Sequence, residues 1–390
     1  MENKFIGSPE NVIVNKFKNF SNFVMSYDGF VYVIIGGWDY IGNIPDDPRQ
    51  EALNIFCNGI RLGRSMGVDP EDLFSVHLYI VISEKGEIIR RFLKGLFVEQ
   101  YGTGIAGNAP VGRFPLIHME LVPIPLLEGL NALAWFEFSD HDGNFPNDGR
   151  SHFELSDIPN ILFPRDLVCS SLAVVKRYLF SAPIFNCTPS ETGWQLTKNI
   201  GDSWNLLMQK MHWIGANFRQ LGYLSIQTED IDKQLPVTFE YIKKIFNNPP
   251  AIDIFQGEEY ILTPECFFGN EEPSQTFTGK QTITYINIPN SPSPRGPYNN
   301  FVRMGKWIKT SFFPTSPDLS LIQQVFPKIT NVLLIKIRVI QGFYHKYLPE
   351  IQQSIQRIWQ KNEYPLVLII PCRKLPFNYQ MTVSFIAAFA

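Results

Sequence analysis

Two polar residues on one predicted strand are the first candidates for chemistry in this sequence. His118 and Glu120 alternate with Ile117 and Met119 in the run that follows Arg113. Because the side chains of a strand point alternately to its two faces, His118 and Glu120 share a face. They could line a cleft, where the carboxylate could move protons, or they could form a solvated face. We favour the solvated face.

Cys372 is the second candidate, as a cleft residue or as an inert buried thiol. Only Arg373 and Lys374 offer basic neighbours, which disfavours a nucleophilic role. The chain has five scattered cysteines and lacks the Cys-x-x-Cys or His-x-x-x-His spacing of zinc sites. We therefore expect no metal, and reduced thiols in a cytoplasmic protein.

The remaining candidates favour plain structural interpretations. His77 lies in an apolar predicted strand and is interpreted as a satisfied core histidine. His141, between two aspartates, falls in a turn-rich segment and predicts a solvated turn. The run Gly102-Thr-Gly-Ile-Ala-Gly107 follows a predicted helix and lacks the Lys-Ser/Thr of a phosphate loop, so it predicts a helix exit. No cofactor is predicted.

Composition excludes several classes of protein. The net charge of −3 with only 18% charged residues argues against nucleic-acid binding, which needs a basic face. The sequence shows no apolar run long enough for a membrane span and no apolar signal-peptide region at its start. Its 390 residues favour two or three domains, and its 32 phenylalanines favour aromatic-filled cores over a dedicated aromatic pocket.

The elements that would position these residues recur three times. Similar stretches begin at Ser21, Ser170 and Asn299, and each reads as a polar pair, an apolar strand, a tight turn and an aromatic-rich strand. In the first copy, Asp28-Gly29 is a strong hairpin signal. Helices over residues 48–66 and 85–101 and strands over residues 74–82, 114–121 and 132–138 complete the order β-β-α-β-α-β-β.

The other two copies are expected to repeat this order in altered form. In the second, we predict a strand region over 176–185, helices over 199–221 and 239–246, and strands over 260–268 and 282–288. In the third, we predict strands over 307–313, 331–340, 366–370 and 381–389, a stub over 319–326 in place of the first helix, and a helix over 347–359. The predicted domains span residues 1–140, 155–290 and 291–390.

Three motifs in this order resemble the RidA/YjgF/UK114 proteins. The run Arg295-Gly-Pro-Tyr298 and the hairpin after it resemble the opening Gly-Pro-Tyr-Ser and hairpin of that family. The run Pro110-Val-Gly-Arg113 to Pro123 resembles the family's closing pattern of Pro-x-Arg, a strand and Leu-Pro. Cys372-Arg-Lys-Leu-Pro376 and the terminal strand resemble that pattern again.

The resemblance implies an α+β fold of chorismate-mutase-like domains. RidA proteins are homotrimers with active sites between subunits that hydrolyse enamines and imines. Three copies in one chain would form a pseudo-threefold trimer with a barrel-like β core and helices outside, so the protein is expected to act as a monomer. The chain is also similar to chorismatases, single chains of comparable length that hydrolyse the enolpyruvyl ether of chorismate.

The resemblance also implies roles for particular residues. Arg113 matches the arginine that binds the substrate carboxylate, a task that suits its planar fork. Tyr298 matches a tyrosine that lines the cleft, although a buried tyrosine with a bonded hydroxyl fits as well. Glu137 lies near the place of the family's acid on the terminal strand, and Cys372 matches a Cys-Arg pair of chorismatases. In the third copy, that strand carries no acid.

Two functions follow from this reading. The first is a small-molecule enzyme of a biosynthetic pathway, which hydrolyses, eliminates or rearranges a carboxylated enol ether, enamine or imine in one inter-domain cleft. The second is a catalytically inactive pseudotrimer that binds a ligand or a partner protein. An enzyme should keep an arginine and an acid facing one cleft, whereas an inactive chain should have clefts filled by aromatic residues.

Overall fold

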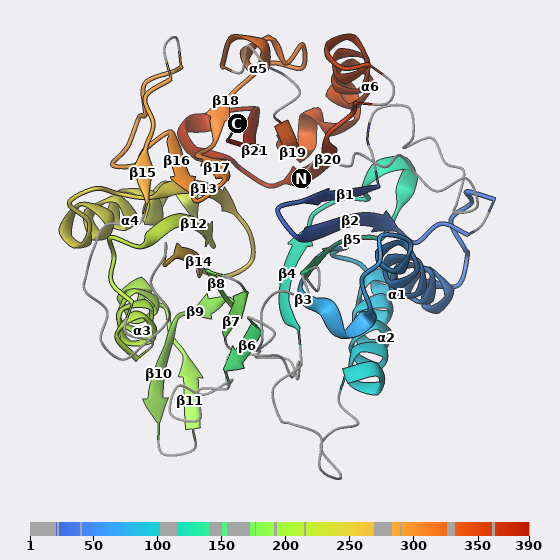
Figure 1. Ribbon diagram of the computed structural model, residues 1–390, viewed down its shortest axis with the longest axis horizontal. Helices are drawn as coiled ribbons and strands as arrows, with labels where there is room; N and C mark the ends of the chain where they lie inside the picture. The colour runs from blue at the N-terminus through green and yellow to red at the C-terminus, as the bar shows by residue number, and fades with distance from the viewer. Residues whose placement is uncertain are drawn as a thin grey trace.

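The computed structural model describes residues 21, 23–39, 41–101, 115–139, 150–153, 172–175, 177–190, 193–213, 216–268, 283–288, 291–325, 332–360 and 363–389. Within them lie six α-helices and three larger sheets, with one two-stranded ribbon made by β10 (Cys187–Ser190) and β11 (Gly193–Leu196). The chain is therefore a mixed α+β protein, as the sequence predicts. In Figure 1 the strands lie toward the centre of the molecule and the helices lie outside them.

The first sheet has the predicted order of elements. Its strands are β1 (Val24–Tyr27), β2 (Phe30–Gly36), β3 (Leu73–Val81), β4 (Leu116–Val122) and β5 (Ala132–Ser139), arranged as β1-β2-β5-β3-β4. Only β3 and β4 pair in parallel, because helix α2 (Glu84–Tyr101) lies between them in the chain. Helix α1 (Pro48–Ser65) connects β2 to β3 and packs beside α2.

The second sheet repeats this arrangement. Its order is β13-β12-β14-β8-β7-β6, built from β6 (Arg150–Phe153), β7 (Leu172–Val175), β8 (Tyr178–Ser181), β12 (Leu221–Thr228), β13 (Ala251–Gln256) and β14 (Ile261–Phe267). A short strand, β9 (Ile184–Phe185), also pairs with β14. Helix α3 (Ile200–Trp213) precedes β12, and helix α4 (Ile231–Ile245) links it to the parallel β13.

The third sheet repeats it again with a shortened first helix. Its order is β15-β16-β17-β21-β19-β20, from β15 (Thr284–Tyr285), β16 (Phe301–Met304), β17 (Trp307–Thr310), β19 (Val332–Ile340), β20 (Leu366–Cys372) and β21 (Met381–Ala388). A short strand, β18 (Phe313–Pro314), also pairs with β21. The predicted stub is helix α5 (Ser320–Val325), and the long helix is α6 (Gln341–Ile358).

The three sheets share one further detail of register. In each sheet a long central strand (β3, β12 or β19) pairs with the closing strand, which is the last long strand of that sheet (β5, β14 or β21). The register of this pairing shifts once, between Leu73 and Ser75 in β3 and between Leu221 and Tyr223 in β12. In β19 the shift falls between Val332 and Leu334. Positions after this shift can therefore be matched across the three sheets one by one.

Local sequence explains how helix α1 begins and why it packs closely on the first sheet. The Asp47 side chain caps α1 by accepting a hydrogen bond from the Arg49 N–H at 2.9 Å, and Pro48 opens the helix. Gly59 and Gly63 let the helix approach the sheet closely. A Cβ on Gly59 would lie 2.5 Å from a ring atom of Phe136, which leaves no room for a larger residue.

The structure differs from several predictions for the second copy. The helix expected over 199–221 ends at Trp213, and α4 begins at Ile231 rather than at residue 239. The strands β12 and β13 have no counterpart among the predictions. The strand expected over 282–288 is the shorter β15, which pairs with β16 in the third sheet. Pro236 inside α4 hides this helix in the sequence, because proline lacks the N–H of the helical ladder.

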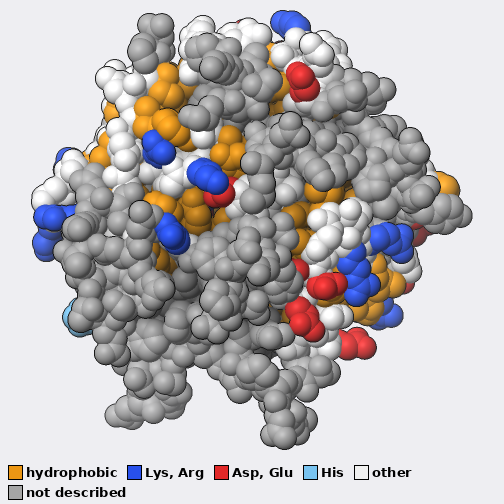
Figure 2. Space-filling view, viewed as in Figure 1, with side chains coloured by type: hydrophobic (Ala, Val, Ile, Leu, Met, Phe, Trp, Pro, Cys, Tyr) orange, Lys and Arg blue, Asp and Glu red, His pale blue; other side chains and the backbone are white. Residues whose placement is uncertain are grey.

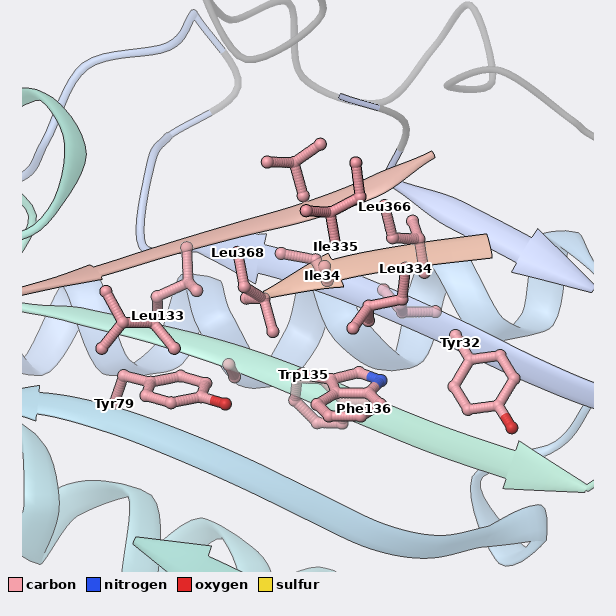
Figure 3. Packing of buried hydrophobic residues seen from close by; sticks show 14 of the residues in the cluster. Tyr32, Ile34, Tyr79, Leu133, Trp135, Phe136, Leu334, Ile335, Leu366 and Leu368 are labelled. Atoms are coloured by element: carbon pink, nitrogen blue, oxygen red, sulfur yellow. The ribbon is translucent and has the colours of Figure 1, made fainter. Parts of the chain in front are cut away.

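The first and third sheets share a hydrophobic interface. Figure 3 shows Leu133 and Trp135 of β5 facing Leu334 of β19 and Leu368 of β20. These residues belong to one buried cluster, whereas the second sheet packs most of its residues into a cluster of its own with α3 and α4. The units are thus joined by direct packing of sheet on sheet.

The outer surface is mixed in charge on the face that Figure 2 shows. Acidic and basic side chains of the described residues lie side by side in the region of α2. There Glu87 pairs with Arg90 at 2.7 Å and with Arg91 at 2.8 Å. Among the described helices, none combines the length and the hydrophobicity that crossing a bilayer needs.

Candidate functional site

A central cavity lies where strands of the three larger sheets meet. The space between its walls, including its opening to solvent, is about 850 Å³. Pockets between structural units are common binding sites. Its polar and charged lining residues are His77, His118, Glu120, Ser225, Gln227, Thr263, Glu265, Lys309, Thr310, Lys336, Arg338 and Ser384.

Strand register brings three rings together on the wall that the first sheet forms. His77 on β3 lies opposite Trp135 on β5 and beside His118 on β4. The His77 ring stacks between its two neighbours, with centroids 4.2 Å from His118 and 4.5 Å from Trp135. The stack fixes the orientation of the His77 imidazole.

Glu137 lies next to His77 as a possible proton partner. Its Oε2 is 3.4 Å from His77 Nε2. Burial lowers the pKa of His77 well below its usual range and raises the pKa of Glu137. Near neutral pH the imidazole is therefore uncharged, and the carboxyl holds its proton more tightly than an exposed one. Such a pair can exchange a proton with a molecule in the cavity.

The third sheet supplies the cations of the cavity. Lys336 and Arg338 lie two residues apart on β19 and so share its inner face. Lys309 lies on β17 and donates a hydrogen bond to the carboxylate of Glu265 on β14. This ion pair joins the third sheet to the second.

Arg338 binds acids from both of the other sheets. Its guanidinium donates to both carboxylate oxygens of Glu120, at 2.5 and 3.0 Å, and from Nε to Asp253 at 3.2 Å. It also lies 3.4 Å from the ring centroid of Phe255, a cation–π contact. Because Glu120 is on β4 and Asp253 is on β13, one side chain ties three sheets together.

Lys336 is held more loosely than the other two cations. Its Nζ lies 3.7 Å from Asp253 Oδ2, which is beyond hydrogen-bonding distance. The amine also lies 5.8 Å from the ring centroid of Trp135. Of the three cations, Lys336 is therefore the most available to an anionic ligand.

The structure places two of the predicted site residues at this cavity. Glu120 lines it, and Glu137 adjoins it through His77. The prediction that His118 and Glu120 form a solvated face is wrong: the Glu120 side chain is only 12% exposed, because it is covered by Arg338 from another unit. His77 lies in the wall of the cavity with its side chain 21% exposed, rather than in an apolar core. Arg113 lies outside the described residues.

Tyr298 and Cys372 lie away from the central cavity. Tyr298 is buried, its ring centroid is 5.3 Å from that of Phe312, and its hydroxyl accepts a hydrogen bond from the Arg295 N–H at 3.3 Å. Burial raises the pKa of Tyr298 to about 12. Cys372 is buried as well, and burial raises the pKa of its thiol, which disfavours the thiolate.

The main residues that sequence reasoning missed are charged positions in apolar strands. Lys336 and Arg338 alternate with isoleucine and valine in β19, and Asp253 sits between isoleucines in β13. This period-two pattern was a readable signal of a polar inner face. Glu265 matches Glu137 by register, since each lies opposite the residue that follows the shift in its sheet. The closing strand therefore carries an acid in two of the three units.

The described residues offer no metal site. Within these ranges, no group of three or more His, Cys, Asp or Glu residues is arranged to hold a metal ion. The acids at the cavity pair with cations: Glu120 and Asp253 with Arg338, and Glu265 with Lys309.

Comparison with known proteins gives structural matches only. No family model and no curated protein matches the sequence. A chorismatase structure covers 93% of this chain and 100% of its own, at 9% identity and a TM-score of 0.47. A hypothetical protein from Giardia lamblia covers 36% of this chain and 99% of its own, at 17% identity and a TM-score of 0.29. The YjgF gene product from E. coli covers 34% of this chain and 98% of its own, at 11% identity and a TM-score of 0.26. The chain thus resembles YjgF-type proteins over single units and a chorismatase over most of its length.

Proposed function

We propose that this chain is a small-molecule enzyme that binds a carboxylated molecule in the central cavity and transfers a proton to or from it. The observation that carries the proposal is the pair of the partly exposed His77 and the buried Glu137 in the wall of a cavity that also holds cations. His77 lines the cavity, so it is the group that would contact the substrate. Glu137 lies behind it and would orient the imidazole and exchange its proton.

The cations set the class of substrate. Lys336 is loosely paired, so it can bind a carboxylate without first losing a strong partner. Lys309 lines the same cavity and adds positive charge. The reactions that fit are hydrolysis, elimination or rearrangement of an enol ether, enamine or imine, because each needs a proton delivered to or taken from carbon or a leaving group. The resemblance to RidA proteins and chorismatases supports the same classes.

We further propose that the three units pack around a pseudo-threefold axis as domains over residues 1–140, 155–290 and 291–390, with β6 added to the second unit and β15 to the third. Support comes from Phe30, Tyr178 and Trp307, which each open the second strand of a hairpin in their own sheet. Their ring centroids lie 5.6, 5.5 and 6.4 Å apart, with interplanar angles of 83°, 84° and 82°. Three aromatic rings at matched positions thus form a near-regular triangle. The three units of one chain would then take the places of the three subunits of a homotrimer, and we expect the protein to be a monomer in solution.

A thermal-shift screen tests the proposed function. We expect at least one of a panel of small carboxylated compounds, including chorismate, to raise the melting temperature of the wild type. Lys336→Met should lose that stabilisation, whereas His77→Gln should keep binding and lose turnover of the same compound. A panel that shifts no melting temperature, or a His77→Gln variant that turns substrate over at the wild-type rate, would overturn the proposal. Arg113→Ala in the same screen tests the carboxylate anchor that the family resemblance implies.

The alternative is a protein that binds a ligand or a partner protein without chemistry. It is supported by the ion pairs at the cavity, in which most of the charged side chains hold the units together. Arg338 pairs with Glu120 and Asp253, and Lys309 pairs with Glu265. In that case a compound would bind to the wild type and to His77→Gln with equal affinity, and neither would change it.

A further inference from the structure

Two buried lysines line the central cavity, and their surroundings differ. The side chains of Lys309 and Lys336 are 10% and 11% exposed. Lys309 donates a hydrogen bond directly to Glu265. Lys336 makes its closest polar approach to Asp253, at 3.7 Å, and its amine donates no hydrogen bond within the ranges that the structure describes. One lysine is a firmly paired cation, and the other is a loosely held amine.

Asp253 neutralises Lys336 only in part, because it serves another partner. The same oxygen, Oδ2, accepts a hydrogen bond from Arg338 Nε at 3.2 Å. Arginine is always charged and is the closer of the two, so it takes the larger share of this carboxylate. Burial lowers the pKa of Lys336 by more than Asp253 raises it, which increases the fraction of free amine.

We propose that Lys336 is a nucleophilic lysine that forms an imine with the carbonyl group of a small oxo acid bound in the central cavity. This inference rests on the proposed function, because it requires that the cavity admit a carboxylated molecule. A buried lysine next to another cationic group is a recognised setting for amine nucleophiles. Protonated, Lys336 attracts the carboxylate of the incoming molecule, and deprotonated, it attacks the carbonyl group; Lys309 keeps positive charge in the cavity throughout.

The step balances without an added oxidant or reductant. The lone pair of Nζ attacks the carbonyl carbon while the C=O π electrons move to oxygen, which takes up a proton as the nitrogen loses one. The resulting hydroxyl accepts a second proton and leaves as water, while the nitrogen lone pair forms the C=N bond. Loss of the last N–H proton gives a neutral imine and one water. His77, with Glu137 behind it, lines the same cavity and can exchange these protons.

Reductive trapping tests the inference. The wild-type protein is incubated separately with pyruvate, glyoxylate and phenylpyruvate in the presence of cyanoborohydride, which converts an imine to a stable secondary amine. Peptide mass spectrometry then locates the adduct. We expect at least one oxo acid to label Lys336 at least tenfold more than the surface residue Lys374. Lys336→Arg should lose the adduct, and Lys243→Arg, a matched control at an exposed lysine of α4, should keep the Lys336 adduct.

Thermal shift with lactate separates this inference from the proposed function. Lactate has the carboxylate of pyruvate and lacks its carbonyl group, so it can bind in the cavity but cannot form an imine. Stabilisation by lactate or an oxo acid, with no excess of label at Lys336, overturns the inference and leaves the proposed function standing. Labelling spread evenly over surface lysines also overturns it. If none of these acids stabilises the protein or labels Lys336, the inference is overturned. The wider carboxylate panel then decides the proposed function.

Discussion

The inner faces of the first and third sheets have the same strand order and register but opposite chemistry. Where β3 has His77 and Tyr79, β19 has Lys336 and Arg338 at the matched positions. Glu137 of β5 and Ile386 of β21 are also at matched positions. Glu137 pairs with Ser75 and Ile386 pairs with Leu334, and these are the first residues after the register shift in their strands. The first sheet thus presents imidazoles and acids, and the third presents cations.

This difference shows what three units in one chain can do that three identical chains cannot. Identical subunits must place the same residue at each matched position. Here Arg338 binds Glu120 of the first sheet and Asp253 of the second, and Lys309 binds Glu265 of the second. The complementary charges fix which unit lies beside which, and they leave Lys336 as the most loosely paired cation of the cavity.

The largest expected effect comes from breaking the Arg338 contacts. Arg338→Met leaves Glu120 and Asp253 without their main partner, and breaking a buried ion pair on one side costs about 3–5 kcal/mol of unfolding free energy. Urea denaturation measures this loss. The control is Arg91→Met on α2, an exposed residue whose pair contributes about 0.5 kcal/mol or less. Equal losses in the two variants would contradict the role given to Arg338.

The aromatic triangle should be the next most sensitive feature. Trp307→Ala removes a buried ring that contacts Phe30 and Tyr178, and we expect a loss of about 3 kcal/mol in urea denaturation. Trp307→Phe keeps an aromatic ring and should lose less than half as much. If the phenylalanine variant is as unstable as the alanine variant, ring packing at this position is not what joins the units.

A smaller effect concerns pH and separates the first sheet from the third. Because burial lowers the pKa of His77 and His118, the unfolded chain binds more protons than the folded chain as pH falls below about 6.5, the usual imidazole value. The contribution of these two histidines to stability therefore rises with pH up to that value and levels off above it. His77→Gln should flatten this rise between about pH 5 and 7, because the pKa of a histidine in the unfolded chain is about 6.5. His345→Gln, at an exposed residue of α6 outside the cavity, is the control for the substitution itself.

Part of this account was readable from the sequence. The hairpin at Asp28-Gly29, the two helices of the first unit and the order of its strands follow from turn chemistry and periodicity, and the structure confirms them. Glu120 and Glu137 were named as candidates, and both lie at or next to the cavity. The alternation of Lys336 and Arg338 with apolar residues in β19 is also visible in the sequence and indicates a polar inner face.

The rest depended on contacts that no local pattern contains. Glu120 looks solvent-facing in its own strand because its cover, Arg338, is 218 residues away in the chain. The helix α4 was misplaced because Pro236 opposes helix formation locally, while packing of Ile242 against the second sheet favours it. Tertiary packing therefore decided the features that local sequence left open.

The most direct test of the central claim is calorimetric titration of the best carboxylated compound from the screen into wild type, Lys336→Met and Lys374→Met. A lost contact to a charged group costs about 1.5–3 kcal/mol, so we expect Lys336→Met to bind at least about tenfold more weakly than wild type. Lys374→Met changes a lysine that pairs with Asp232 outside the cavity, and it should bind as wild type does. Equal affinity of Lys336→Met and wild type would contradict the claim that the central cavity is the binding site.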